Sequence, residues 1–256
     1  MRSIIIIPAR YASTRFPGKP LARIGGIPMI VRVAQRVTEC ADVVLVATDD
    51  RRIYDTCEQA GIRVVMTDSG HRSGTDRIYE AYTKISAECG EFDIVVNVQG
   101  DEPFINPQHV RELISSFSDR TVDIATLCTP FPADRKYEEL ADPNRVKVVC
   151  GVDNMALYFS RSVIPYLRGI PQNVWPQRHT FLTHIGVYAY RSDVLARITR
   201  MPQSPLELCE SLEQLRWLEN GLKIKVNRVN SQSVGIDTPE DLEAAEALLA
   251  ETDTIQ

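Results

Sequence analysis

The chain has 256 residues, of which 44% are hydrophobic and 25% are charged, as is ordinary for a soluble globular protein. This composition excludes extensive disorder, and the length suits one α/β domain with an elaboration, or two closely joined lobes. The formal net charge of −5 argues against a general nucleic-acid binder, because such proteins concentrate Lys and Arg on a basic surface.

The first half of the chain alternates between apolar β-branched runs and helical patterns. Strands are predicted at Ser3–Pro8, Val43–Thr48, Arg63–Met66, Ile94–Val98 and Asp123–Cys128. Helices are predicted at Pro28–Cys40, Arg51–Ala60, Thr75–Cys89 and Pro107–Ser118. This alternation predicts an α/β fold with a doubly wound, mostly parallel sheet.

A basic loop follows the first strand directly and carries Arg10, Arg15 and Lys19. The strand holds four consecutive isoleucines and should be buried on both faces, so the loop leaves the carboxyl edge of a sheet, where ligands bind. Three cations there favour a multiply charged anion such as a triphosphate, and Gly18 permits close approach. A solvated basic turn is the alternative. Pro20 stands where a Walker A loop has Ser or Thr, which excludes ordinary P-loop chemistry.

Two further segments should reach the same edge of the sheet. The segment His71–Arg77 leads into a helix, and it could contact phosphate or a base edge, or supply only an N-cap from Ser73 or Thr75. Asp101 follows the strand at Ile94–Val98. A carboxylate facing a triphosphate needs a divalent cation such as Mg²⁺ between them, although a surface Asp in a turn is equally common.

The pattern changes after about residue 130. Arg145–Cys150 and Ala156–Ser160 predict a hairpin, and Thr183–Tyr190 predicts another strand. Residues 130–190 should therefore form an antiparallel addition, in which the loop near Arg168–Thr180 is a candidate lid or subunit contact. Two helices, a short strand at Lys223–Val229 and a last helix from about Glu240 should follow.

Polar side chains in this second half have two interpretations each. His184 and Tyr188 are predicted to share one strand face. They could form a buried hydrogen-bonded pair, or they could form one wall of a sugar pocket. A helix with a capping box opens at Ser204. Its buried stripe is predicted at Leu208, Leu212 and Leu215, with Glu210, Glu213, Gln214 and Trp217 on the opposite side. A solvated face accounts for the acids, but less well for a large aromatic side chain.

Asp237 precedes the last helix. Thr238 suits the N-cap of that helix, Pro239 its first position and Asp241 the acid of a capping box. Asp237 is not needed for this cap. Together with Asp101 it forms a plausible metal pair opposite the basic loop.

The six cysteines are dispersed and include no C-x-x-C pair: Cys40, Cys57, Cys89, Cys128, Cys150 and Cys209. We expect reduced, mostly buried thiols, which fits a cytoplasmic protein. The isoleucine run is too short for a signal peptide or a membrane span, so we expect neither.

Eight segments, in order and at their spacings, resemble the cytidylyltransferases that activate 3-deoxy-manno-octulosonate (Kdo) for lipopolysaccharide assembly. They are Ile7–Arg15, Pro17–Pro20, Ser73–Arg77, Val96–Pro103, Ala156–Arg161, His184–Tyr188, Leu212–Arg216 and Gly235–Leu242. The resemblance runs nearly end to end. It implies a single nucleotidyltransferase domain over residues 1–256, of nucleotide-diphospho-sugar transferase type, with 130–190 as a dimerisation or lid elaboration of a homodimer.

The resemblance also implies a reaction, in which the 2-hydroxyl of Kdo attacks the α-phosphorus of CTP and pyrophosphate leaves. The residues implied at the CTP site are Ala9, Arg10, Arg15, Lys19, Ser73 and Arg77. Asp101 and Asp237 would hold Mg²⁺ and act with Lys19 in catalysis. The residues implied at the sugar-acid site are Gln99, Arg161, His184, Tyr188, Glu210 and Gln214, with Arg161 as partner of the Kdo carboxylate. No nucleic acid or membrane partner is implied.

Two rival functions fit the same residues. One is activation of a different sugar acid, such as a sialic acid, or use of a different nucleotide. The other is a noncatalytic nucleotide sensor that keeps the fold without turnover. The presence of all candidate metal and phosphate residues argues against the sensor.

Overall fold

The computed structural model describes residues 1–12, 16–71, 73–230, 235–236 and 238–253. The chain divides into two compact units, one formed by Met1–Arg111 with Ser233–Gln256 and the other by Glu112–Gln232. The expectation of a single domain with an elaboration at 130–190 stays a prediction.

The first unit is built on a parallel sheet with the strand order β6-β1-β4-β5. Its strands are β1 (Ser3–Ala9), β4 (Val43–Thr48), β5 (Val64–Met66) and β6 (Ile94–Asn97). In the central strand β1 all four isoleucines are fully buried, as expected for a strand covered on both faces. Because the strands are parallel, the loops after β1, β4, β5 and β6 all leave from one edge.

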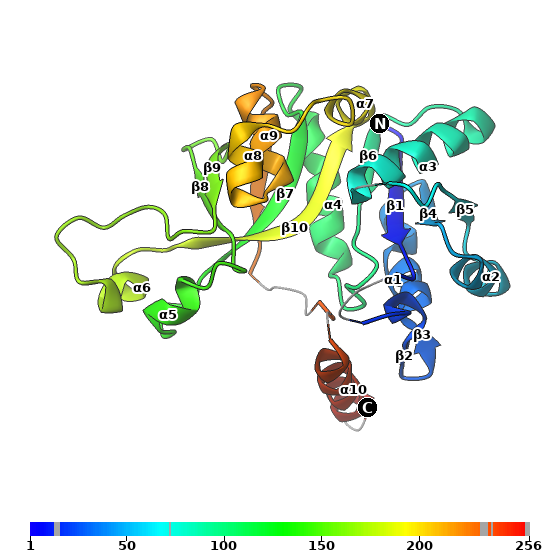
Figure 1. The fold of residues 1–256 in the computed structure, drawn as a ribbon, viewed down its shortest axis with the longest axis horizontal. Helices are drawn as coiled ribbons and strands as arrows, with labels where there is room; N and C mark the ends of the chain where they lie inside the picture. The colour runs from blue at the N-terminus through cyan, green and yellow to red at the C-terminus, as the bar shows by residue number, and fades with distance from the viewer. Residues whose placement is uncertain (13–15, 72, 231–234, 237, 254–256) are drawn as a thin grey trace. The chain divides into compact units, whose positions relative to one another are not determined.

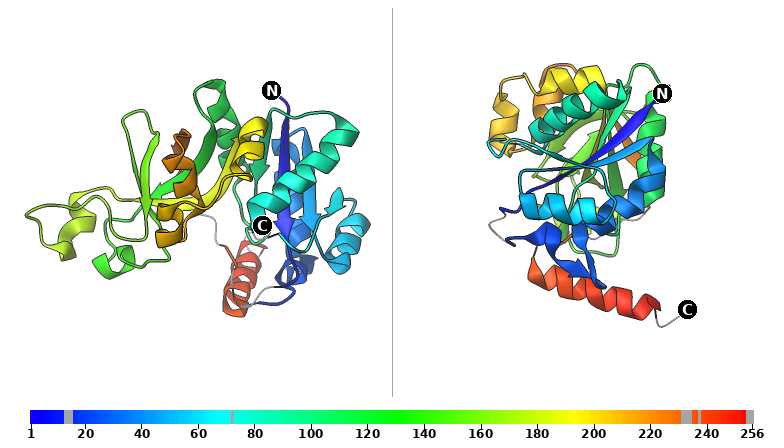
Figure 2. Two further views of the ribbon diagram at one scale, coloured as in Figure 1. Left: turned by 45° about the horizontal axis from the view of Figure 1, so that its top comes forward. Right: turned by 90° about the vertical axis from the view of Figure 1, so that its right-hand side faces the viewer.

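The helices of the first unit are α1 (Met29–Val37), α2 (Arg51–Gln59), α3 (Gly74–Cys89) and α10 (Pro239–Asp253). The chain moves outward from β1 to β5 through α1 and α2 and returns to β6 through α3. Right-handed crossovers therefore place α3 on the opposite face from α1 and α2. Figure 2 shows α3 running across β1.

Three helices of the first unit begin at a side-chain cap, and the caps at Ser73 and Thr238 were predicted. The side chain of Asp50 accepts a hydrogen bond from the N–H of Arg52, and that of Ser73 accepts one from the N–H of Asp76. At α10, the Asp241 carboxylate accepts from the N–H of Thr238 at 2.9 Å, which confirms the capping box.

The start of α10 is anchored within the first unit by a small apolar cluster. Ile24, Met29, Ile236 and Ala245 are buried together there. Ile24 and Ile27 belong to a two-stranded hairpin that the sequence did not predict, β2 (Arg23–Ile24) with β3 (Ile27–Pro28), and it follows the short 3₁₀ helix Lys19–Leu21. The end of the basic loop and the segment before α10 therefore share one cluster.

The second unit contains five strands, of which β8, β9 and β10 were predicted as an antiparallel addition (Figure 1). They are β7 (Ile124–Pro130), β8 (Lys147–Cys150), β9 (Ala156–Ser160), β10 (Leu182–Arg191) and β11 (Ile224–Arg228). The long strand β10 pairs antiparallel with β7 and with β8, and β8 pairs antiparallel with β9. β11 runs parallel to β7. The parallel sheet with an antiparallel addition is thus confirmed.

Short helices complete this unit, and α4 (Pro107–Ser115) carries the chain into it. The short helices of the second unit are α5 (Tyr137–Leu140), α6 (Trp175–Arg178), α7 (Ser192–Ile198), α8 (Pro205–Glu210) and α9 (Glu213–Glu219). The second unit also has 3₁₀ turns at Ser116–Ser118 and Gln172–Val174, and the first unit has one at Thr38–Cys40. A second cluster, made by Phe131, Leu140, Trp175 and Phe181, joins α5 and α6 to the strands. The region predicted as a loop near Arg168–Thr180 thus includes α6.

The single helix predicted from Ser204 is wrong. Ser211 has a left-handed backbone with φ of 51°, and it ends α8 and lets α9 start in a new direction. As a result Leu208 is 61% exposed, whereas Gln214 is 5% and Trp217 only 1% exposed. The large aromatic side chain therefore faces the core, and the helical period predicted across Ser211 does not hold.

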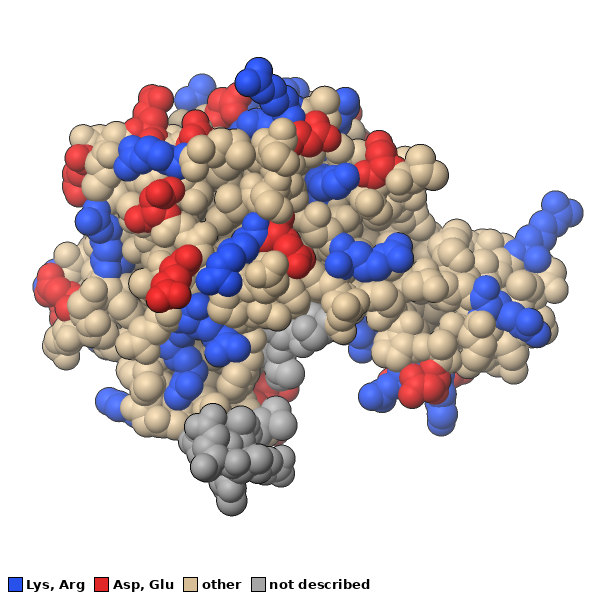
Figure 3. Space-filling view, turned by 180° about the vertical axis from the view of Figure 1, so that it is seen from behind, with Lys and Arg blue, Asp and Glu red and all other residues tan. Residues whose placement is uncertain are grey.

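On the face shown in Figure 3, Lys and Arg are interspersed with Asp and Glu. Among the described helices, none combines the length and apolar character that crossing a bilayer requires.

Candidate active site

The basic loop after β1 is closed by a backbone hydrogen bond, from the N–H of Gly18 to the carbonyl of Tyr11 at 3.0 Å. Gly18 has φ of +74°, and a Cβ atom there would lie 3.1 Å from the Tyr11 ring. The backbone conformation therefore favours glycine, and a side chain at this position would also crowd the Tyr11 ring. Arg10 is exposed at the start of this loop, and Arg15 lies outside the described residues.

Lys19 and Asp101 meet at the edge of the parallel sheet. The Nζ atom of Lys19 lies 2.6 Å from Oδ2 of Asp101, and the two side chains are 13% and 32% exposed. A flexible ammonium and a partly exposed carboxylate are thus held together before any ligand binds. The basic loop and the acid after β6 are neighbours, as the sequence predicts.

The segment that carries Asp237 is tied to the same place. The N–H of Ile236 donates to the carbonyl oxygen of Asp101 at 2.9 Å. Asp237 itself lies outside the described residues. Its immediate neighbour in the chain is nevertheless hydrogen bonded to the residue predicted as its metal-binding partner.

The donor set fits a magnesium ion that arrives with a nucleotide. Mg²⁺ is commonly held by one or two carboxylates together with phosphate oxygens and water. Asp101 offers a partly exposed carboxylate next to a lysine, which suits a shared phosphate ligand. Within the described ranges there is no group of three or more His, Cys, Asp or Glu residues that would form a cage of protein ligands alone.

A cavity of about 180 Å³ opens at the same sheet edge in the first unit. It is lined by Pro8, Ala9, Arg10, His71, Ser73, Gly74, Arg77 and Gln99. Five of these residues were predicted to bind substrate: Ala9, Arg10, Ser73, Arg77 and Gln99. The fold therefore brings together residues from the ends of β1 and β6 and the start of α3 around one space.

Arg77 is almost fully buried at this cavity and its guanidinium is already engaged. It donates to the carboxylate of Asp49 at 2.6 Å and to the hydroxyl of Thr67 at 2.5 Å. Asp49 and Thr67 follow β4 and β5, so Arg77 ties the ends of two strands to the first turn of α3. Arg77 therefore both holds the wall of the cavity in place and contributes a positive charge to it.

The sequence placed His71 in the candidate segment before α3 without a role of its own, and it missed Glu80. The Nε2 atom of His71 makes a short hydrogen bond with the carboxylate of Glu80, which also accepts from Lys84 at 2.6 Å and from the N–H of Asp68 at 2.9 Å. Partial burial raises the pKa of Glu80, but these hydrogen bonds outweigh it and lower the pKa to about 2. The i, i+4 spacing of Glu80 and Lys84 on α3 was the one sequence signal for this cluster.

In the second unit, Arg161 and Glu210 bind each other through the backbone. The Glu210 carboxylate accepts from the N–H of Arg161 at 2.8 Å and from the hydroxyl of Ser160 at 2.7 Å. The guanidinium of Arg161 donates to the carbonyls of Glu210, Pro143 and Ser211. Three carbonyls thus fix its orientation, and among the described side chains none forms an ion pair with it.

His184 and Tyr188 lie side by side on β10, with ring centroids 5.4 Å apart. A regular strand separates residues four apart by roughly 13 Å. The contact is possible because the register shifts between Ile185 and Tyr188, so that His184 faces Cys128 and Tyr188 faces Thr126 on β7. The shared face is as predicted, but the bulge that closes the distance was not.

Burial sets the protonation of this pair. It lowers the pKa of His184 to about 3 and raises the pKa of Tyr188 well above its usual value. Both side chains are therefore neutral at physiological pH. Trp217 packs edge-on against Tyr188, and Gln214 is buried one helical turn before it on α9.

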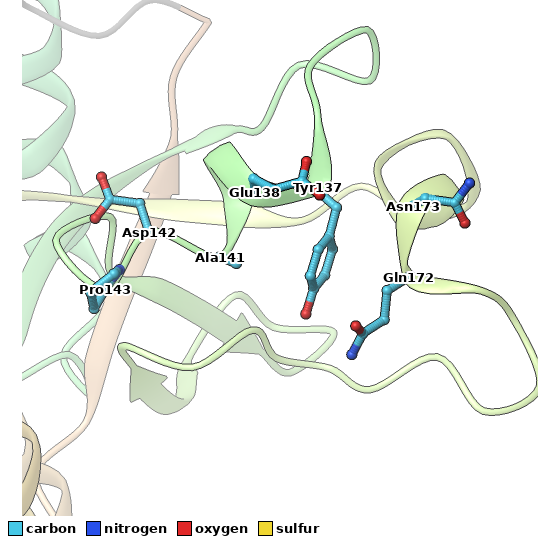
Figure 4. A pocket seen from close by; sticks show the side chains of 7 residues that line it. All are labelled: Tyr137, Glu138, Ala141, Asp142, Pro143, Gln172 and Asn173. Carbon is cyan, nitrogen blue, oxygen red and sulfur yellow. The ribbon is translucent and has the colours of Figure 1, made fainter.

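A larger pocket of about 660 Å³ lies elsewhere in the second unit, between α5 and the 3₁₀ turn Gln172–Val174 (Figure 4). Tyr137 and Gln172 point toward it, and the other lining residues are Glu138, Ala141, Asp142, Pro143 and Asn173. None of these residues was predicted to bind substrate.

The first unit has the features of a defined class. A parallel sheet, a cationic loop at its carboxyl edge and a lysine paired with an acid define a nucleotide-binding α/β protein. The chain also matches a family model described as Cytidylyltransferase over residues 4–224.

Two curated relatives carry the name 3-deoxy-manno-octulosonate cytidylyltransferase. One from Parabacteroides distasonis is 57% identical over 252 residues, which cover 98% of this chain and 99% of the relative. One from Nitratidesulfovibrio vulgaris is 46% identical over 250 residues, which cover 97% and 96%. The chain belongs to the 3-deoxy-manno-octulosonate cytidylyltransferase family.

Solved structures agree with this assignment. The structure of CMP:2-keto-3-deoxy-manno-octonic acid synthetase complexed with CTP superposes with a TM-score of 0.89 at 42% identity, over 98% of this chain and 100% of that one. A cytidylyltransferase from Leptospira borgpetersenii has a TM-score of 0.60 at 15% identity, covering 98% and 87%, and shows the shared fold alone. The predicted fold class and family resemblance are confirmed.

Proposed function

We propose that the protein joins CTP and Kdo to give CMP-Kdo and pyrophosphate, and so activates Kdo for lipopolysaccharide biosynthesis. The observation that carries this proposal is the identity of 57%, over nearly the full length of both chains, with a relative named for this activity. The 42% identical structure complexed with CTP supports the nucleotide assignment.

The reaction forms one bond to phosphorus and breaks another. The 2-hydroxyl oxygen of Kdo attacks the α-phosphorus of CTP, the hydroxyl proton is lost, and the bond from the α-phosphorus to the bridging oxygen of pyrophosphate breaks. No covalent intermediate with the protein is required. Alignment and neutralisation of developing charge supply most of the acceleration in such transfers.

The residues of the first unit suit this task. Arg10 and Lys19 would bind the triphosphate, together with Arg15, and Lys19 would stabilise the crowded α-phosphorus in the transition state. The 180 Å³ cavity would receive the nucleoside part, with Ala9, Ser73 and Arg77 at its wall. Lys19 would exchange its contact with Asp101 for phosphate oxygens when the nucleotide binds.

Asp101 and Asp237 would hold Mg²⁺ beside the triphosphate. When bound, the metal would neutralise phosphate charge and polarise phosphorus toward attack. Asp101 has the exposure and the neighbouring cation that a shared phosphate ligand needs.

The sugar acid would be bound in the second unit by Arg161, His184, Tyr188, Glu210 and Gln214. Gln99, which the resemblance also implies for the sugar acid, lines the 180 Å³ cavity of the first unit. Arg161 offers a guanidinium held by three backbone carbonyls, and it would pair with the Kdo carboxylate. Glu210 would act by holding Arg161, and the neutral His184 and Tyr188 would meet sugar hydroxyls.

A homodimer and a cytoplasmic location complete the proposal. Val152, Leu157 and Tyr166 are large apolar side chains exposed on the antiparallel part of the second unit, where a subunit contact was expected. Sedimentation equilibrium would measure the mass of the particle, and a monomer at micromolar concentration would contradict the dimer.

The direct test measures pyrophosphate released from CTP, Mg²⁺ and Kdo. We expect rapid release that depends on all three, with little release when UTP replaces CTP or a sialic acid replaces Kdo. A noncatalytic sensor would bind CTP and release no pyrophosphate, and that result would contradict the proposal. Faster release with a sialic acid than with Kdo would assign the other sugar acid.

A further inference from the structure

Thr126 on β7 stands at the centre of a small polar network in the second unit. Its side chain is fully buried. The hydroxyl oxygen lies 3.0 Å from Nε2 of His184, 2.9 Å from the carbonyl oxygen of Val187 and 3.2 Å from that of Ile185. The side chain of Tyr188 also hydrogen bonds to that of Thr126. Nothing in the sequence pattern marked this residue.

The two carbonyls decide where the hydroxyl proton points. A threonine hydroxyl has one proton to donate and two lone pairs that accept. A carbonyl oxygen can only accept a hydrogen bond. If the hydroxyl proton of Thr126 pointed elsewhere, a lone pair of its oxygen would face a lone pair of the Val187 carbonyl oxygen at 2.9 Å, which is repulsive. Thr126 therefore donates to the carbonyls and meets His184 with a lone pair. Nε2 of His184 must then carry the proton.

The remaining ring nitrogen of His184 is consequently an acceptor. A neutral imidazole has one N–H and one lone pair, and burial keeps this ring neutral. The ring is held by edge contacts to Phe159 at 5.0 Å and to Tyr188 at 5.4 Å. Within the described ranges, Nδ1 of His184 has no hydrogen-bond partner.

The same hydroxyl also holds the bulge that shapes the site. Gly186 and Val187 are the two residues inserted in β10 opposite the step from Thr126 to Leu127 on β7. The carbonyls on either side of Gly186 both accept from Thr126. One buried group thus fixes the spacing of His184 and Tyr188 as well as the tautomer of the imidazole.

We propose that Thr126 is a positioning residue that fixes His184 as the Nε2–H tautomer, so that Nδ1 accepts a hydrogen bond from a hydroxyl of the sugar acid. This inference rests on the proposed function, because it takes His184 as part of the sugar site. An acceptor nitrogen attracts a hydroxyl and opposes a carboxylate oxygen. Arg161 would therefore bind the carboxylate of the sugar acid, and His184 would accept a hydrogen bond from one of its hydroxyls.

The first test reads the tautomer in the full protein without substrate. The chain is labelled with ¹⁵N-histidine, and His184 is assigned by its loss in His184→Asn. We expect a protonated Nε2 and a nonprotonated Nδ1 for His184 in the wild-type protein. A proton on Nδ1, or a positively charged ring at pH 7, would overturn the inference, and this reading needs no variant of Thr126.

The second test compares Thr126→Val, which removes the hydroxyl at nearly constant volume, with Thr126→Ser, which keeps it. For Thr126→Val we expect KM for Kdo to rise about tenfold, KM for CTP to stay within about twofold, and the His184 signal to lose its single tautomer. Thr126→Ser should restore all three. A Thr126→Val protein with wild-type KM for Kdo overturns the inference, and so does a Thr126→Ser protein as impaired in KM as Thr126→Val.

The two hypotheses fail in different ways. A wild-type protein that releases no pyrophosphate from CTP and Kdo contradicts the proposed function. The tautomer is measured without substrate, and a wild-type KM for Kdo in Thr126→Val contradicts the inference while the proposed function stands.

Discussion

The two units prepare their candidate binding groups in opposite ways. In the first unit the groups are charged and meet each other directly, as Lys19 and Asp101 do at 2.6 Å. In the second unit the Arg161 guanidinium is held by backbone carbonyls, and the side chains of His184 and Tyr188 are neutral. The difference matches what each would bind, because a triphosphate is recognised chiefly by charge and a sugar chiefly by directed hydrogen bonds.

Lys147 illustrates the second unit's way of holding charge. Its side chain is fully buried, and its Nζ atom donates to the carbonyls of Asp142 and Arg145. Burial lowers the pKa of Lys147 to about 8, and the neighbouring Arg145 and Arg161 contribute to the decrease. Lys147 thus donates to backbone carbonyls, and among the described residues the carboxylates of Asp142 and Glu210 act on it only through a longer-range attraction that partly offsets the decrease in pKa.

The largest effect should come from breaking the charged pair of the first unit with Asp101→Asn. We expect turnover with Mg²⁺ to fall by at least about 1,000-fold, because a metal-holding charge is lost. Without Mg²⁺, CTP should bind more tightly than to the wild-type protein, because one negative charge has gone and Lys19 is released. Steady-state rates and calorimetric titration of CTP measure the two effects.

The control for Asp101→Asn is Asp134→Asn, which removes an exposed acid of the second unit. It should leave both quantities unchanged, and both proteins should melt within a few degrees of the wild type. Near-normal turnover of Asp101→Asn at ordinary Mg²⁺ would remove Asp101 from the catalytic site.

The next effect concerns the buried charge of the second unit and is tested with Lys147→Met. The folded protein releases the Lys147 proton at about pH 8, whereas the unfolded chain keeps it to about pH 10.5. Between these values the unfolded state binds more protons, so this group makes the wild-type protein more stable as the pH rises. The difference in unfolding free energy between wild type and variant should change by about 3 kcal/mol across that window.

Urea unfolding at pH 7.5 and at pH 10.5 measures this difference. Lys223→Met removes an exposed lysine of the same unit and serves as the control, for which the difference should not depend on pH. Equal pH dependence for Lys147→Met and Lys223→Met would mean that Lys147 titrates as an ordinary surface lysine.

A smaller effect is expected from Arg161→Lys, which keeps the positive charge but removes the planar fork. A lysine cannot donate to three separate carbonyls and still offer two parallel hydrogen bonds to a carboxylate. KM for Kdo should rise about tenfold while KM for CTP stays constant. Arg178→Lys, an exposed substitution on α6, is the matched control. Unchanged KM for Kdo in Arg161→Lys would mean that charge alone suffices in the second unit, as in the first.

Much of the first unit could be predicted from sequence because its apolar runs and helix caps indicate the same elements that the structure buries and caps. The isoleucines of β1 form an apolar run and are fully buried, and the predicted N-cap Ser73 caps α3. Asp101 could be placed near Lys19 because parallel strands deliver their loops to one edge. Arg15 and Asp237 were predicted for the same site and lie outside the described residues, so their roles stay predictions.

The second unit was harder to predict because two backbone irregularities control it. Ser211 takes a left-handed conformation with no glycine to announce it, and this turns Gln214 and Trp217 inward. The bulge near Gly186 brings His184 against Tyr188, and it is stabilised by Thr126, some 60 residues earlier in the chain. Neither feature follows from helical or strand periodicity, because each depends on contacts made after folding.

The central claim is that the basic loop and the acids after β6 and before α10 surround one triphosphate. A crystal structure of this protein with CTP and Mg²⁺ tests it most directly. The account predicts phosphate oxygens within hydrogen-bond distance of Arg10 and Lys19, and a metal ion bound by Asp101 and Asp237 on the phosphate side. A triphosphate bound elsewhere, with Lys19 still paired to a metal-free Asp101, would contradict it.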